Sequence, residues 1–295
     1  STYPTLYGEK SVLRLLNISD AMHDLDGLGF EKDILNRFED MLIGGEGIIL
    51  VSGPTGSGKT TTLYSTLNKM DNPDVNIVTI EDPIEYDLDN INQAQVNRRS
   101  GVTFASALRA ILRQDPDIIM VGEVRDEETV ELAIRAALTG HLVFSTIHTN
   151  DSASGFTRLL NWGMEPFLIT STVKGILSQR LVRKLCKECR EKHMVEPSEL
   201  IKFGLEVDEP IEFYKGVGCL SCRNTGYQGR VGLFELIRMN NDIADLVMEQ
   251  KPGHVIRQKA IEYGMFSLLH DGLIKAQRGE TSLQEIVETL GTDTI

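Results

Sequence analysis

Residues 48–67 constrain the fold more than any other part of this 295-residue chain. They read IILVSGPTGSGKTTTLYSTL, in which a strand-like apolar run meets the pattern G-x-x-x-x-G-K-[ST] and a helical segment follows. In that setting the pattern predicts a phosphate-binding loop. The glycines let backbone N–H groups turn around phosphate oxygens, and the N-terminus of the helix adds its dipole.

The side chains of this loop predict how a nucleoside triphosphate is held. We expect Lys59 to reach the β- and γ-phosphates and the Thr60 hydroxyl to bind Mg²⁺. The alternative is a glycine-rich turn that binds no ligand. The predicted nucleotide-binding residues are Gly53, Pro54, Thr55, Gly56, Ser57, Gly58, Lys59, Thr60 and Thr61.

Short apolar runs alternate with helical periodicity from about residue 30 onward. The predicted strands are residues 48–51, 75–80, 118–121 and 142–147, and the predicted helices are residues 59–69, 103–113 and 126–138. Alternation of this kind is typical of an α/β fold with a parallel sheet covered by helices. Ligands of such folds bind at the carboxyl ends of the strands.

The predicted strand at 118–121 ends in Gly122 and Glu123. We expect Glu123 to lie at the carboxyl edge of the sheet, beside the γ-phosphate and its Mg²⁺. A buried carboxylate without a partner is costly, so a strand end of this kind favours a function. The alternative is a surface ion pair between Glu123 and Arg125.

Two further strands end in polar residues. The strand at 75–80 is followed by Glu81, Asp82 and Glu85, whose charges repel one another unless a cation such as nucleotide-bound Mg²⁺ lies near. A solvated acidic loop is the alternative. The strand at 142–147 is followed by His148, which we interpret as a sensor of the phosphate; a structural histidine is the alternative.

Several arginines are candidates for contacts with a neighbouring subunit. Arg109 and Arg113 lie four residues apart, on the side of a predicted helix opposite its apolar face. Arginines contributed across a subunit boundary stabilise the transition state of phosphoryl transfer in nucleotide-driven assemblies. Arg125 and Arg230 are further candidates, and for each arginine a solvated surface position is the alternative.

All four cysteines fall in two C-x-x-C pairs. Four thiolates in this arrangement suit tetrahedral Zn²⁺, and the predicted ligands are Cys186, Cys189, Cys219 and Cys222. Disulfides or a redox pair are the alternatives. We expect the zinc to fold an insert that carries its own short helix near PSELIKF.

The net charge restricts the kinds of partner. A formal charge of -13 argues against general affinity for nucleic acid or anionic lipid, because both require an excess of Lys and Arg. The longest apolar runs are strand-sized, far below the ~20 residues of a membrane-spanning helix. No secretory signal is visible.

Four motifs together resemble one family of motors. GPTGSGKTT resembles its Walker A motif, TIEDPIEY its Asp box, IIMVGEVRD its atypical Walker B motif and STIHTND its His box. The family is that of the secretion ATPases of type II secretion and type IV pilus assembly, the GspE/PilB family, and the resemblance covers essentially the whole chain. The paired C-x-x-C motifs are similar to the metal-binding insert of its assembly-type members, which favours secretion or pilus extension over retraction.

The resemblance implies roles for individual residues. Glu85 would be the general base that activates water, Glu123 would act with Thr60 at Mg²⁺, and His148 would report on the γ-phosphate. Arg14 matches an arginine that the preceding domain swings onto the nucleotide. Positions associated with phosphate or intersubunit contacts are matched by Arg109, Arg113, Arg125 and Arg230.

The resemblance also implies an architecture: a RecA-like P-loop NTPase core, a zinc-binding insert and an all-helical C-terminal subdomain. The expected units are the end of a truncated N-terminal domain with its linker at 1–20, the ATPase domain at 21–183, the tetracysteine unit at 184–232 and the helical unit at 233–295. Within them we expect a strand over 8–16. Thr281 with Gln284 predicts a capping box before the last helix.

The implied function is a hexameric ATPase that uses ATP, Mg²⁺ and structural Zn²⁺. It would lie in the cytoplasm, peripheral to the bacterial inner membrane, where an inner-membrane platform protein would be its partner and nucleic acid would not. Two other functions remain open: a zinc-containing RecA-like motor on nucleic acid, which the acidic composition disfavours, and a nucleotide-dependent scaffold that does not hydrolyse ATP.

Overall fold

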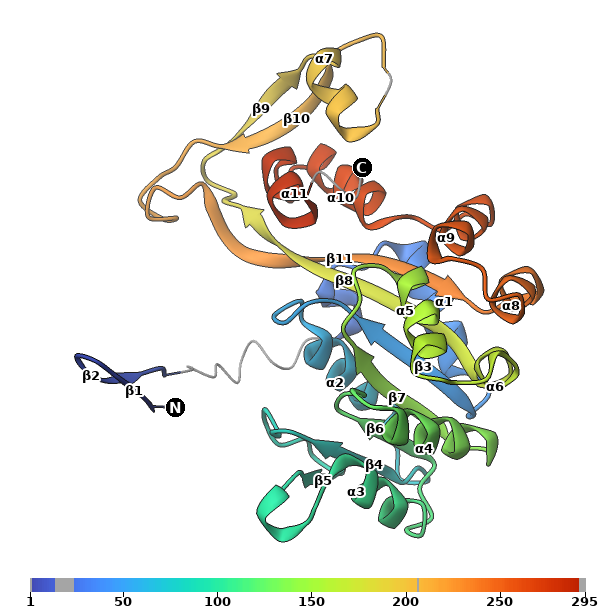
Figure 1. Ribbon diagram of the computed structural model, residues 1–295. Helices are drawn as coiled ribbons and strands as arrows, with labels where there is room; N and C mark the ends of the chain where they lie inside the picture. Colours follow the sequence, from blue (N-terminus) through green and yellow to red (C-terminus); the bar gives the residue numbers. More distant parts are fainter. Residues whose placement is uncertain (1, 14–23, 206, 292–295) are drawn as a thin grey trace.

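A sheet of seven strands forms the centre of the computed structural model, which describes residues 2–13, 24–205 and 207–291. The strand order is β11-β8-β3-β7-β6-β4-β5, and each neighbouring pair is parallel except β11 with β8 (Figure 1). The strands are β3 (Gly47–Ser52), β4 (Ile77–Glu81), β5 (Asn92–Gln95), β6 (Ile118–Val121), β7 (Leu142–Ile147), β8 (Val173–Leu185) and β11 (Tyr227–Arg238). The expected α/β fold with a parallel sheet is confirmed.

Helices cover both faces of this sheet. All six residues of β3 are buried, and because successive side chains of a strand point to opposite faces, Ile48 and Leu50 pack on one face while Ile49 and Val51 pack on the other. The first face carries α3 (Phe104–Ile111), α4 (Glu127–Leu138), α5 (Ser152–Asn161), α6 (Pro166–Thr172), α8 (Asn241–Met248) and α9 (Gly253–Glu262). The second carries α1 (Lys32–Leu42) and α2 (Lys59–Met70).

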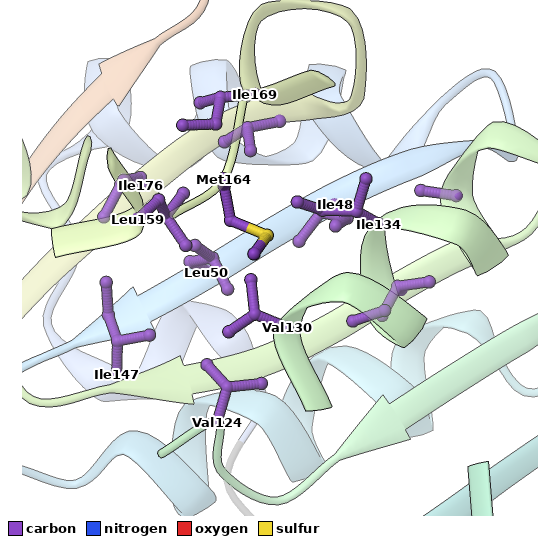
Figure 2. Packing of buried hydrophobic residues seen from close by; sticks show 14 of the residues in the cluster. Ile48, Leu50, Val124, Val130, Ile134, Ile147, Leu159, Met164, Ile169 and Ile176 are labelled. Atoms are coloured by element: carbon purple, nitrogen blue, oxygen red, sulfur yellow. The ribbon is translucent and has the colours of Figure 1, made fainter. Parts of the chain in front are cut away.

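The packing of the first face follows the helical period of α4. Val130, Ala133, Ile134 and Ala137 are buried along one stripe of this helix, and Asp126 caps its first turn by accepting a hydrogen bond from the Thr129 backbone N–H. Figure 2 shows side chains of this stripe packed against those of β3. The predicted central strands and helices are thus confirmed to within about two residues at each end.

An insert lies between β8 and β11. It contains an antiparallel pair, β9 (Arg190–Val195) and β10 (Ile211–Gly216), joined through α7 (Pro197–Leu200) and a 3-10 turn at Ile201–Phe203. The short helix expected near PSELIKF is therefore confirmed.

The insert shares a hydrophobic core with the two last helices, α10 (Leu268–Gln277) and α11 (Leu283–Leu290). Leu200 and Phe213 of the insert, Ala276 of α10 and Ile286 of α11 are buried in one cluster. The insert is consequently packed against the C-terminal helices by apolar contacts as well as by its cysteines.

Two expectations about the C-terminal part were wrong. Residues 233–238 are not helical, because β11 continues through them as the antiparallel partner of β8, and helices begin only at Asn241. The last helix is capped by Ser282, whose hydroxyl accepts from the Glu285 backbone N–H. Thr281 is fully buried and donates to the Arg183 carbonyl oxygen instead of capping.

The N-terminal residues form a hairpin of β1 (Thr2–Thr5) and β2 (Gly8–Ser11). The strand expected over 8–16 is described only as far as β2, and Arg14 lies outside the described residues. Within the described ranges, no helix combines the length and apolar character needed to cross a membrane.

Candidate functional site

The loop between β3 and α2 is shaped by its glycines. Gly53, Gly56 and Gly58 have φ angles of 149°, 80° and 88°, in the region that other residues rarely adopt. A Cβ atom at Gly53 would lie 2.5 Å from Ser57 Oγ and 2.6 Å from the Gln179 carbonyl oxygen. Only glycine fits there, so the loop can turn tightly from the carboxyl end of β3 into the first turn of α2.

Lys59 is held inside this loop. Its Nζ donates to the carbonyl oxygens of Gly53 at 2.8 Å and Pro54 at 3.1 Å, and the residue is 9% exposed. Burial lowers the pKa of Lys59 to about 8; Glu123 acts in the opposite direction and Arg180 lowers it further. The ammonium is therefore poorly solvated and lies within electrostatic reach of both residues.

Ser57 supplies a second sign that the loop accepts a ligand. Its hydroxyl is buried and, among the described residues, has no hydrogen-bond partner. Buried polar atoms are nearly always paired, so an unpaired hydroxyl in a glycine-rich loop at the start of a helix fits the binding of phosphate oxygens.

Strand β8 anchors the loop from the side. The Gln179 side chain donates from Nε2 to the Ser57 carbonyl oxygen at 2.7 Å and accepts from Thr62 Oγ1 at 2.9 Å. In the parallel pairing of β3 with β8, Ser52 lies opposite Ser178 and their hydroxyls are hydrogen-bonded. Gln179 could not be identified from the sequence, because nothing local shows that β8 is the neighbour of β3.

Glu123 and His148 meet at the carboxyl edge of the sheet, beside the loop. Glu123 Oε2 lies 2.6 Å from Arg125 Nε and 3.6 Å from His148 Nε2, with the Glu123 side chain 14% exposed. The Thr146 hydroxyl donates to the Gly122 carbonyl oxygen at 2.8 Å and ties the two strand ends together. The structure thus brings Lys59, Glu123 and His148 together, and the Glu123–Arg125 pair is present as well.

The environment of His148 keeps its imidazole neutral. Burial lowers the pKa of His148, and Lys59 lowers it further, whereas Glu123 acts to raise it. A neutral imidazole near Lys59 can both donate and accept a hydrogen bond, which suits a group that responds to a phosphate.

Glu81 does not join an acidic cluster, which corrects the expectation for this residue. Glu81 is 3% exposed and accepts from the Tyr64 hydroxyl, from Thr79 Oγ1 at 2.6 Å and from Gln93 Nε2 at 3.1 Å. The alternation of β4 turns its side chain inward toward α2, where burial and Glu81 raise the pKa of Tyr64. Glu81 is a buried hydrogen-bond acceptor that orders this part of the interior.

The segment that carries Glu85 is tied to the same hydroxyl. The Glu85 backbone N–H donates to Tyr64 Oη at 3.4 Å, and the Tyr64 and Tyr86 rings meet edge to face with centroids 4.6 Å apart. Burial, Glu81 and Glu85 raise the pKa of Tyr86 to about 12. Glu85 is therefore positioned from α2, the helix that also carries Lys59 and Thr60.

The predicted arginines are dispersed. Arg109 forms an ion pair with Glu128 at 2.5 Å, Arg113 is exposed at the end of α3, and Arg230 is exposed on β11 opposite Arg183. Of the predicted arginines that the structure describes, Arg125 contacts Glu123. Arg180, which the sequence analysis did not identify, lies within electrostatic reach of Lys59.

The four cysteines form a second candidate site. Their Sγ atoms lie within 4.8 Å of one another, with separations of 3.8 Å for Cys186–Cys219, 3.8 Å for Cys189–Cys222 and 3.7 Å for Cys219–Cys222. Four sulfur atoms placed tetrahedrally at the Zn–S distance of about 2.3 Å are about 3.8 Å apart. A disulfide requires about 2.05 Å, so the geometry fits a metal and not disulfides.

The charge state of one thiol also fits a metal ligand. Burial acts to raise the pKa of Cys222, but the backbone N–H groups of Cys219 and Gly226 donate to its sulfur, each at 3.2 Å, and lower that pKa, whereas burial raises the pKa of the neighbouring Cys189. The thiolate is the form that binds metal.

Comparisons with known proteins agree with this geometry. The chain is 47% identical to the type IV pilus assembly ATPase PilB of Thermus thermophilus and 45% identical to the type II secretion system ATPase E of Vibrio cholerae, each over 97% of this chain. It spans 32% and 57% of the lengths of those two relatives.

The fold agrees with solved structures. The crystal structure of the pilus retraction motor PilT with bound ADP superposes with a TM-score of 0.68 at 29% identity, covering 97% of this chain and 72% of that chain. The ATPase DotB of Legionella pneumophila has a similar fold, with a TM-score of 0.65 at 24% identity over 90% of this chain and 64% of that one. A mainly parallel sheet with a phosphate loop after a central strand fits a RecA-like P-loop core. The family described as type II/IV secretion system protein matches residues 1–288, and the chain belongs to that family.

Proposed function

We propose that this chain is the motor part of an ATPase that powers assembly of a type IV pilus or a type II secretion pseudopilus. The observation that carries the proposal is the meeting of Lys59, Glu123 and His148 beside a phosphate loop, in a chain 47% identical to a pilus assembly ATPase. Groups at this edge can position and neutralise a triphosphate, which is what phosphoryl transfer requires of a protein.

Each residue of the site would have its own role in ATP hydrolysis. The loop backbone and Lys59 hold the β- and γ-phosphates, while Thr60 and Glu123 would hold Mg²⁺, which neutralises charge on the phosphates when bound. Glu85 is the proposed general base for the attacking water, and the Tyr64 hydroxyl orders its segment. His148, neutral at pH 7, would exchange hydrogen bonds with the γ-phosphate.

We also propose that the four cysteines hold a structural zinc ion. Their spacing supports this, as does the position of Cys186 directly after β8 and of Cys222 shortly before β11. A metal there would fix both ends of the insert and so help it to fold. The insert between β8 and β11 and the last two helices, α10 and α11, would accordingly act as one packed body on the edge of the ATPase domain.

The proposed assembly is a hexamer at the cytoplasmic face of the bacterial inner membrane, coupled to an inner-membrane platform protein. Arg109, Arg113 and Arg230 are exposed, and we propose that they contact the nucleotide of a neighbouring subunit. The similarity to PilB and to the type II secretion ATPase supports this part of the proposal.

Phosphate release from Mg²⁺-ATP, measured over a range of protein concentrations, tests the proposal. We expect release whose specific activity rises with concentration, because subunits supply arginines to one another. Glu85→Gln should reduce the rate about 10²- to 10⁴-fold, the usual contribution of a general base, while nucleotide affinity is kept. Glu249→Gln, which changes an exposed glutamate on the C-terminal helices, is the matched control. Binding without release in the unmodified chain at every concentration would support a non-hydrolysing scaffold instead.

A further inference from the structure

Arg180 occupies a position next to the phosphate loop that follows from the sheet order. The parallel pairing places Ser178 opposite Ser52, the residue directly before Gly53. Gln179 then points toward α2 and binds the loop. By strand alternation Arg180 points to the opposite face, toward the loop that carries His148.

Two backbone carbonyl groups orient the guanidinium. Arg180 Nη1 donates to the Gln179 carbonyl oxygen at 3.2 Å, and Nη2 donates to the Asn150 carbonyl oxygen at 2.9 Å. Asn150 lies two residues after His148, and Asp151 caps α5 by accepting from the Ser154 backbone N–H at 2.7 Å. A guanidinium has five N–H donors in a fixed plane, so this anchoring leaves others to bind a ligand.

Within the described part of the chain, the acidic neighbours of Arg180 accept no hydrogen bond from its guanidinium. Glu235 is fully buried; its Oε1 accepts from the Ser152 backbone N–H at 2.9 Å, and its Oε2 lies 4.0 Å from Arg257 with no hydrogen-bond partner among the described residues. Asp151 is occupied at the start of α5, where its second oxygen accepts from Ser154 Oγ at 2.9 Å. These carboxylates act on Arg180 at longer range and leave its remaining donors to another acceptor.

Arg180 and Lys59 are two cations within electrostatic reach of each other. Burial lowers the pKa of Arg180, with Glu235 and Asp151 acting against it, and Arg180 in turn lowers the pKa of Lys59. Two partly dehydrated cations in electrostatic reach of each other are unfavourable unless an anion lies between them. A terminal phosphate offers several oxygens to both groups, and the planar guanidinium binds phosphate in a bidentate manner.

We propose that Arg180 binds the γ-phosphate in the nucleotide site of its own subunit, held in place by the carbonyl oxygens of Gln179 and Asn150. This inference rests on the proposed function and adds to it a phosphate-binding residue in cis, distinct from the exposed arginines proposed to act on a neighbour. It also connects the phosphate directly to the segment that carries His148.

Affinities for a non-hydrolysable ATP analogue and for ADP, both with Mg²⁺, test the inference in wild type, Arg180→Gln and Arg180→Lys. Loss of a charge-assisted hydrogen bond in Arg180→Gln should weaken analogue binding about 10- to 100-fold and leave ADP binding unchanged. The affinity of Arg180→Lys for the analogue should lie between those of wild type and Arg180→Gln, because lysine keeps the positive charge and lacks the planar guanidinium. Arg238→Gln is the matched control, since it removes an arginine from the β8–β11 ladder at the end that pairs with Gly175.

An unchanged ratio of analogue to ADP affinity in Arg180→Gln would overturn the inference, and so would an equal loss for both nucleotides, which would indicate only a support of the loop. If Arg180→Gln fails to fold, the ratio of analogue to ADP affinity is measured in Arg180→Lys instead, and an unchanged ratio there would overturn the inference. A wild-type chain that binds neither nucleotide contradicts the proposed function itself, and the inference falls with it. Wild-type binding with unaltered ratios in the variants contradicts the inference alone.

Discussion

Replacement of Gln179 by methionine tests how the phosphate loop is held. Methionine has a similar length but no amide, so it fills the space and removes both hydrogen bonds, to the Ser57 carbonyl oxygen at 2.7 Å and from Thr62 Oγ1 at 2.9 Å. Gln179, Ser57 and Thr62 are 2%, 3% and 2% exposed, so water does not readily replace the amide.

The expected loss follows from these contacts. Each buried hydrogen bond contributes about 1 kcal/mol net, and each polar group left without a partner costs about 1–3 kcal/mol. For two such groups we expect the free energy of unfolding, measured by urea denaturation, to fall by about 2–6 kcal/mol. Nucleotide affinity should fall too, about tenfold for each 1.4 kcal/mol of that loss that acts on the loop.

Gln228→Met is the control, because Gln228 is an exposed residue of β11. Surface substitutions of this kind usually change stability by less than about 0.5 kcal/mol. If Gln179→Met also changed the free energy of unfolding by less than about 0.5 kcal/mol and left nucleotide binding unaltered, the conclusion that β8 holds the loop would be refuted.

Three further predictions concern other charged groups. The affinity for a triphosphate should be constant below pH 8 and fall above it, because phosphate binds the protonated form of Lys59, whose pKa is lowered to about 8. Calorimetry near pH 8 should accordingly detect proton uptake on binding, and pH-independent binding would contradict this. Cys222→Ser should abolish the bound zinc measured by a colorimetric chelator and expose the insert to protease; retention of full zinc would argue against the tetrahedral site. Lys275→Met should reduce the free energy of unfolding by about 3–5 kcal/mol, because it leaves Asp271 buried without its ion-pair partner, and the double variant with Asp271→Asn should lose less.

Local patterns predicted the parts of the molecule that local residues determine. The phosphate loop was predictable because its glycines, Lys59 and Thr60 are adjacent in sequence, and β6 and β7 because apolar runs end abruptly in polar residues. The spacing of Cys186, Cys189, Cys219 and Cys222 indicated a metal site in the same way, and their sulfur atoms meet in the structure.

Contacts set by the strand order could not be predicted. Gln179 contacts the loop, and Arg180 comes within electrostatic reach of Lys59, because β8 pairs with β3, two strands separated by more than a hundred residues. The inward direction of Glu81 depends on Tyr64, Thr79 and Gln93 from three different elements.

The course of β11 was missed for a similar reason. Its residues 233–238 are apolar enough to suit a helix, and only the long antiparallel ladder with β8 makes them a strand. The cap of the last helix was misplaced by one residue because both Thr281 and Ser282 can act as caps. Thr281 instead satisfies the Arg183 carbonyl oxygen in the interior.

The most direct test of the site is a crystal structure of this chain with Mg²⁺ and a non-hydrolysable ATP analogue. We expect Lys59 Nζ to exchange the Gly53 and Pro54 carbonyl oxygens for phosphate oxygens, with the metal beside Thr60 and Glu123 and the γ-phosphate facing His148. An analogue bound away from residues 53–60, or one whose γ-phosphate is remote from Glu123 and His148, would contradict the account.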